Sequence, residues 1–153
     1  MMLAVGVNSY MSLEEADAII ENELLDSDEE YTVWNSLIDK NKEKLIVRGT
    51  HTVDFIPFRG VKYNINKVGE LQWPRLINNE FIVCPLEVKL AVLLQALRDY
   101  TNSSKQENKL QELGVKSYSI NKASITFSDK NNNKLDNGIY NYIYYNILKK
   151  WVV

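Results

Sequence analysis

The chain has 153 residues and a mass of 17.7 kDa, with 45% hydrophobic and 25% charged residues, which suits one globular domain and leaves no room for a second core. Its formal charge of −2 and its pI of about 5.5 argue against a protein whose main task is to coat nucleic-acid backbones. One cysteine, Cys84, excludes an internal disulfide, and one histidine, His51, excludes a zinc site built from histidine and cysteine.

The N-terminal third of the chain predicts two helices. Ser12 is a good N-cap for a helix over residues 13–24, and the glutamate three positions later completes a capping box. A second helix is predicted over residues 29–52, because apolar residues recur there at three- and four-residue steps. We expect an interruption of this helix near Asn41 and Gly49.

The middle of the chain predicts a loop followed by a core helix. Residues 57–85 hold all three prolines and two of the six glycines without sustained periodicity, which predicts a long ordered loop. Loops of this length in compact domains are usually functional. Pro85 then opens a helix so apolar that it must be nearly enclosed. Its pattern fades near Tyr100 into the polar stretch 101–109.

The C-terminal third predicts a hairpin and a last helix. Residues 115–128 alternate between apolar and polar side chains, as a small β-hairpin does, and residues 138–151 predict a helix rich in aromatic residues. We therefore expect a mainly α fold. It is a single domain over residues 1–153, with about four helices, a helical core at 8–100, a long ordered loop and a small β-hairpin before the C-terminal helix.

Charge is distributed unevenly along the chain. Residues 1–39 contain ten acids and no lysine or arginine, whereas residues 40–153 contain all 18 basic residues and the other ten acids. The acidic part of one subunit could attract the basic part of a neighbour, and repetition of that contact closes a ring or grows a filament. The alternative is that the acids form a solvated helix face neutralised within the same fold.

The sequence offers little for catalysis or metal binding. A Ser-His or Cys-His pair could use only His51, and Cys84 lies among apolar neighbours, where a thiol behaves as a small apolar group. The stretch 129–136 resembles the start of an EF-hand loop but lacks the glycine and the bidentate carboxylate that calcium needs. We expect no enzyme, no metal and no cofactor. The absence of a long apolar run also predicts no membrane partner and no signal peptide.

The order of several short motifs resembles a known group of proteins. The motifs are Ser12-Leu13-Glu14-Glu15-Ala16-Asp17-Ala18, Trp34, Arg48-Gly49-Thr50, Phe58-Arg59-Gly60-Val61-Lys62, Gln72-Trp73-Pro74-Arg75 and the helix that Pro85 opens. This run, over residues 7–97, is similar to the head-tail connector or adaptor proteins of tailed phages, a group that includes the family labelled DnaT-like single-stranded-DNA-binding protein. Its most specific piece is Gln72-Trp73-Pro74-Arg75.

The resemblance implies a structural role in a virus particle. It implies a ring, typically of twelve copies, docked beneath the portal protein and offering a surface to a stopper or tail-completion protein. Genomic double-stranded DNA would pass through the ring without sequence-specific binding. The location would be the neck of the virion, and the host cytoplasm during assembly. We do not expect the DNA binding named in the family label, because the net charge is acidic and no strand with interleaved aromatic and basic residues stands out.

Three sets of residues are candidates for function. Aromatic and apolar side chains of the C-terminal helix would contact the portal or another partner: Tyr140, Tyr144, Tyr145, Leu148 and Trp151. Acidic and basic side chains would meet between subunits or pair within one chain: Glu14, Glu15, Asp17, Glu21, Arg59, Lys62 and Arg75. The structural motif is Gln72, Trp73, Pro74 and Arg75, in which Trp73 fixes the loop backbone or simply packs in the core.

Two other functions compete with the connector. The first is a single-stranded-DNA-binding accessory protein of replication, which a salt-titrated binding assay would distinguish. The second is a phage-encoded inhibitor or regulatory module that captures a host protein as a monomer or dimer.

Overall fold

The computed structural model describes residues 2–63, 71–112 and 142–153. Within these ranges it contains four α-helices, a three-stranded antiparallel sheet and one short π-helix. The mainly α fold with a small hairpin is thus confirmed. The hairpin predicted at 115–128 lies outside the described residues, and the sheet is formed elsewhere in the chain. None of the helices in these ranges combines the length and apolar character needed to cross a bilayer.

Helix α1 (Leu13–Glu23) begins where the sequence predicts. The Ser12 side chain accepts a hydrogen bond from the backbone N–H of Glu15 at 3.1 Å, so one of the free donors of the first turn is satisfied. Ala16, Ile19 and Ile20 are buried on one side of the helix. This spacing gives the apolar stripe that packs α1 against the rest of the helices.

The second predicted helix is two helices, α2 (Glu29–Ser36) and α3 (Asp39–Val53). The break lies at Leu37 and Ile38, which are both extended, and not near Asn41 or Gly49. Gly49 lies inside α3, at the place where α4 passes very close to it. A Cβ at this position would lie 2.3 Å from the Val92 carbonyl oxygen, so only glycine permits this approach of the two helices.

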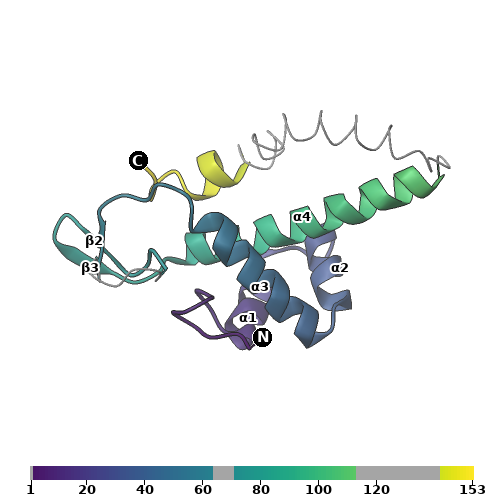
Figure 1. The fold of residues 1–153 in the computed structure, drawn as a ribbon, viewed down its shortest axis with the longest axis horizontal. Helices are drawn as coiled ribbons and strands as arrows, with labels where there is room; N and C mark the ends of the chain where they lie inside the picture. The colour runs from purple at the N-terminus through teal and green to yellow at the C-terminus, as the bar shows by residue number, and fades with distance from the viewer. Residues whose placement is uncertain (1, 64–70, 113–141) are drawn as a thin grey trace.

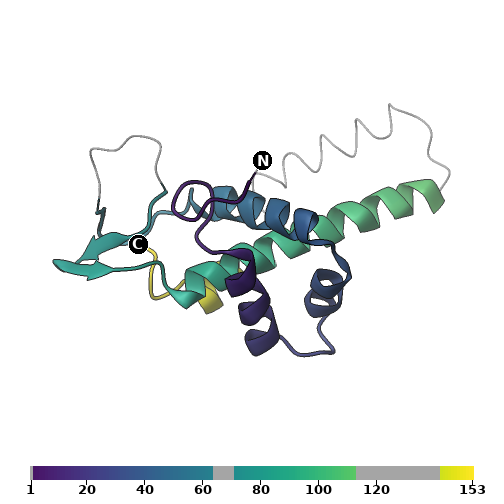
Figure 2. The ribbon, with the colours of Figure 1, turned by 90° about the horizontal axis from the view of Figure 1, so that it is seen from below.

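Helix α4 (Leu86–Glu112) is the longest element and supplies more buried side chains than any other. Its buried side chains are Val88, Ala91, Val92, Leu93, Leu94, Gln95, Ala96 and Leu97. The other three helices gather on one side of its first half (Figures 1 and 2). The expected end near Tyr100 is wrong, because the helix continues through the polar stretch to Glu112.

Residues 57–85 were expected to form only a loop, and this is wrong because they contain the sheet. Strands β1 (Val61–Lys62), β2 (Arg75–Ile77) and β3 (Glu80–Ile82) pair in that order, each antiparallel to the next. A two-residue turn joins β2 to β3, and Asn78 and Asn79 both have positive φ there, as a type I′ turn requires. The β2–β3 hairpin projects from the helices at one end of the molecule (Figures 1 and 2).

The C-terminal segment folds back onto the chain's own core. Its described part is a π-helix, Tyr142–Ile147, followed by a turn, which is shorter than the helix predicted over 138–151. Val152 forms a β-bridge with Phe58, and the Val153 N–H donates to the Pro57 carbonyl at 3.1 Å. These bonds draw the last residues into extended backbone beside the segment that leads into β1.

Candidate functional site

One side of the sheet carries apolar and aromatic side chains that no part of the described chain covers fully. Cross-strand register aligns Val61 with Leu76 and Leu76 with Phe81, so these three side chains share a face. Tyr63 follows β1 directly, and its ring meets that of Phe81, while the exposed Val83 follows the end of β3. We call these five residues, Val61, Tyr63, Leu76, Phe81 and Val83, the aromatic face.

The aromatic face is unusually open for its composition. Tyr63 and Phe81 are each 52% exposed, and their rings meet edge to face with centroids 4.8 Å apart and planes at 76°. Val61 and Val83 are exposed as well. Contiguous exposed apolar surface is the kind of feature at which folded domains bind partners. The paired rings offer flat, rigid surface on which another planar group can stack.

The other side of the sheet faces the core and is held by Arg75. Its guanidinium donates to the carbonyl oxygens of Phe58 (3.2 Å), Arg59 (2.8 Å) and Gly60 (2.8 Å), and to Gln72 Oε1 (3.0 Å). Burial lowers the pKa of Arg75. Because the guanidinium joins the residues before β1 to the start of β2, it holds together the two strands that carry Val61 and Leu76.

A polar cluster joins the sheet to the end of α3. The Gln72 N–H donates to Asp54 Oδ1 at 2.9 Å, and Gln72 Nε2 donates to the carbonyl oxygens of Asp54 and Ile56. The Tyr10 hydroxyl also donates to Asp54 Oδ1, and burial together with this bond raises the pKa of Tyr10. Gln72 therefore connects Asp54 with Arg75.

The tryptophan of the predicted motif lies in the core. Trp73 is 4% exposed and packs edge-on against Phe58 and Trp151, with ring centroids 5.3 Å and 5.7 Å away. The peptide bond between Trp73 and Pro74 is cis. Gln72-Trp73-Pro74-Arg75 thus combines a core side chain with the two polar side chains that hold the sheet in place.

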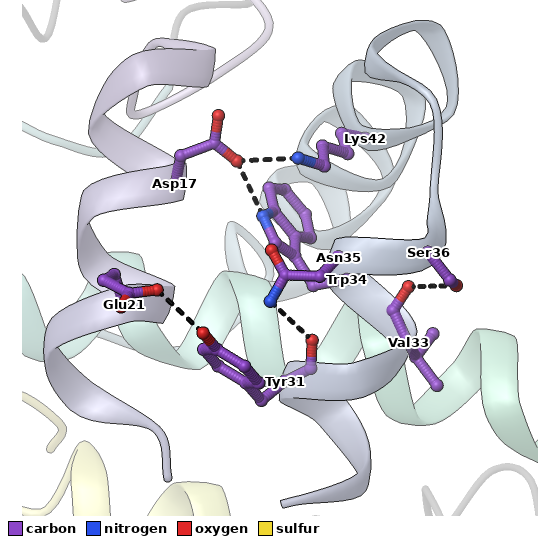
Figure 3. Close-up of polar contacts among 8 residues, drawn as sticks. All are labelled: Asp17, Glu21, Tyr31, Val33, Trp34, Asn35, Ser36 and Lys42. Atoms are coloured by element: carbon purple, nitrogen blue, oxygen red, sulfur yellow. Dashed lines mark hydrogen bonds and ion pairs between the residues drawn. The ribbon is translucent and has the colours of Figure 1, made fainter. Parts of the chain in front are cut away.

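The acids predicted to meet a neighbouring subunit have partners inside the chain. Asp17 forms an ion pair with Lys42 at 2.9 Å and accepts the indole N–H of Trp34 at 2.7 Å (Figure 3). Glu21 accepts the Tyr31 hydroxyl at 3.0 Å, which raises the pKa of that tyrosine (Figure 3).

Two further pairs tie the acidic helices to α4. Glu15 pairs with Lys89, and Glu30 pairs with Arg98 at 3.0 Å. Glu14 is exposed. Together with the contacts of Asp17 and Glu21, these pairs match the alternative in which the acidic charge is neutralised within the same fold.

The basic residues of the same set lie at the sheet end of the molecule. Arg59 is exposed, and its Nε donates to the Val152 carbonyl at 2.7 Å, while Lys62 lies in β1 and Arg75 is buried as described above. The Arg59 contact also brings the exposed Lys149 and Lys150 to this end. The acidic and basic members of the set thus lie in different parts of the chain.

The five C-terminal candidates differ in where they lie. Leu148 is fully buried and Trp151 packs on Trp73, so both side chains face the chain's own core. Tyr144 and Tyr145 lie in the π-helix, and Tyr140 lies outside the described residues. Contact of this set with a partner stays a prediction.

The residues considered for catalysis or metal binding form no cluster. His51 is exposed on α3, and Cys84 is half-buried, where desolvation raises the pKa of its thiol to about 12. Across residues 2–63, 71–112 and 142–153, no group of three histidine, cysteine or acidic side chains could hold a metal ion. The EF-hand-like stretch 129–136 lies outside these ranges.

A family model described as "Putative DnaT-like ssDNA binding protein" matches residues 2–152. The chain belongs to this family. No curated protein and no solved structure matches the chain.

The family match overturns the connector prediction. The description of the DnaT-like family names the binding of single-stranded DNA. Our identification of the chain as a head-tail connector is therefore wrong. The ring of copies, the portal and stopper partners and the passive passage of double-stranded DNA are wrong with it. The predicted location and the predicted lack of enzymatic activity stay predictions.

The sequence-based expectation that no aromatic strand surface stands out missed the sheet, where Tyr63 and Phe81 form an exposed aromatic pair. Sequence reasoning missed Tyr63 and Phe81 because both lie in the region interpreted as a loop. A usable signal was present: Asn78-Asn79 separates two short apolar runs, which is the pattern of a hairpin with a type I′ turn.

Proposed function

We propose that this protein binds single-stranded DNA on the aromatic face, as a non-enzymatic accessory protein. The observation that carries the proposal is the exposed pair of Tyr63 and Phe81 on a sheet that projects from the helices. Unpaired bases stack on aromatic side chains, and each such stack contributes about 1–3 kcal/mol with little dependence on sequence. Membership of the DnaT-like family supports the same function.

The charge near the sheet suits a phosphate backbone better than the net charge suggests. Among the described residues of this end, Arg59, Lys149 and Lys150 are exposed and Lys62 lies in β1, while Glu80 is the acid of the β2–β3 hairpin. The acids of residues 1–39 lie mainly on α1 and α2, where several are paired within the chain. A strand lying on the aromatic face would therefore meet the basic part of the molecule.

The proposal is tested by fluorescence anisotropy with a labelled oligothymidylate and with a duplex of the same length. We expect the single strand to bind and the duplex to bind far more weakly, because duplex bases are already stacked and unavailable. If about two to four phosphates are contacted, a plot of the logarithm of the association constant against the logarithm of the salt concentration should have a slope of roughly −1.4 to −2.8. Equal binding of duplex and single strand, or no binding of the single strand at low salt, would reject the proposal.

A further inference from the structure

A groove opens beside the aromatic face, between the N-terminal loop and the segment that follows β3. It has a volume of about 220 Å³, and its mostly apolar wall includes Val5, Trp73, Pro74 and Val83. Cys84 and Lys89 complete the side nearest α4. The volume lies below the ~300–1,000 Å³ of pockets for drug-sized ligands, so the groove suits a single ring system and not a whole cofactor.

The groove is continuous with the aromatic face. Val83 joins the two, since it is exposed, follows Phe81 by two residues just beyond the end of β3, and lines the groove. Two residues of strand cover about 6.6 Å. This is roughly two stacked nucleotide steps of about 3.4 Å each, so a strand whose bases stack on Phe81 can bring a neighbouring base to the groove.

The lining of the groove suits a planar heterocycle. Trp73 and Tyr10 line the groove, so its wall includes aromatic carbon beside Pro74. A nucleobase presents a flat face that packs on such a wall. Lys89, paired with Glu15, places a cation at the groove, where a phosphate of the same strand would meet it.

We infer that the groove receives one unpaired nucleobase of the DNA strand bound on the aromatic face. The inference rests on the proposed function and adds a second, separate subsite to it. The chain offers a crosslinking target inside the groove, because Cys84 is its single cysteine and lines the wall. It also offers matched variants, since Val5 lines the groove whereas Val7, on the same exposed loop, does not.

The first measurement is photocrosslinking of an oligothymidylate that carries one 4-thiothymidine, at saturating protein, with the crosslinked residues mapped by mass spectrometry. Saturation is established separately by anisotropy. A base in the groove should crosslink to groove residues such as Cys84, Trp73 or Val5. Crosslinks confined to Tyr63 and Phe81 would overturn the inference while leaving binding on the aromatic face intact.

The second measurement compares the affinity of Val5→Asp with that of Val7→Asp. Both variants add one negative charge to an exposed position of the same loop, 57% exposed at Val5 and 70% at Val7, so neither should unfold the protein. We expect Val5→Asp to weaken binding by about five- to tenfold, the scale of one lost stacking contact, and Val7→Asp by less than about twofold. Equal affinities of the two variants would overturn the inference. Absence of any binding by the unmodified protein would overturn the proposed function as well, so the two failures are distinguishable.

Discussion

The helical body and the sheet use their side chains in opposite ways. In the body, the charged side chains of α1 and α2 reach partners on α3 and α4, and Trp34 is buried with its indole N–H bonded to Asp17. On the sheet, Tyr63 and Phe81 remain half exposed although they are the kind of residue that folding normally buries. The difference shows that several acids of the acidic segment are used within the fold, whereas the exposed aromatic side chains lie on the sheet.

The largest expected effect lies in the body, at Trp34. Trp34→Ala removes a large buried side chain and its bond to Asp17, and should lower the free energy of unfolding by about 3–5 kcal/mol. Chemical denaturation measures this change. Trp34→Phe, which keeps most of the volume, should cost much less. The affinity of the folded protein for DNA should stay unchanged in both variants, and a loss of affinity would break the division between body and sheet.

The next effect concerns the crossing of α3 and α4. Gly49→Ala places a methyl group 2.3 Å from the Val92 carbonyl oxygen, and should lower the free energy of unfolding by at least about 1–3 kcal/mol because the helices must separate. Gly6→Ala is the matched control. Its Cβ would meet nothing within 4 Å, so only its φ of 83° is strained, at a cost of about 1 kcal/mol. Equal unfolding midpoints of the two variants would argue against the close crossing.

The next prediction concerns Cys84, which lies between the helical body and the sheet. It is tested by measuring the free energy of unfolding as a function of pH. Burial raises the pKa of its thiol from 9.0 to about 12, so the folded state favours the protonated form. This contribution is fully present below pH 9 and is lost as the pH rises toward 12, by at most about 1.4 kcal/mol per pH unit. Cys84→Ala should flatten the decline of stability between pH 9 and 10, below the range in which Tyr10 adds its own loss. An identical pH profile for the variant would contradict this account.

The smallest effect concerns the ion pair of Asp17 and Lys42. Asp17→Asn keeps an oxygen acceptor for the Trp34 indole but loses the charge, and should cost less than about 1 kcal/mol because Asp17 is partly exposed (Figure 3). Glu14→Gln, at an exposed position of the same helix, should change nothing measurable. Thermal unfolding at low and high salt separates the two, since only the Asp17 contribution should shrink with salt.

Local signals decided how much of the fold the sequence could predict. Ser12 and the apolar spacing after it define α1, and Pro85 with the apolar run behind it defines the start of α4, because caps and periodicity act over a few residues. The break at Leu37 and Ile38 contains no glycine or proline, and Gly49 stays helical where α3 lies close against α4. Such contacts between distant segments leave no local pattern.

The candidate site was missed for a related reason. Strands of two or three residues are too short to show clear alternation, so Tyr63 and Phe81 were not recognised as neighbours across a sheet. The acids were recognised as a group, but their partners Lys42, Lys89 and Arg98 lie 25 to 74 positions away along the chain. Charge counts along a sequence therefore could not show that these acids are used within the fold.

The most direct test of stacking on the aromatic face is the affinity of Phe81→Ser for oligothymidylate, measured beside Phe55→Ser. Phe55 is 89% exposed in the turn after α3 and is not part of the aromatic face, so it controls for the loss of any exposed phenyl ring. We predict that Phe81→Ser lowers affinity by roughly tenfold, with an almost unchanged melting temperature, and that Phe55→Ser binds like the unmodified protein. Undiminished binding by Phe81→Ser would contradict the account.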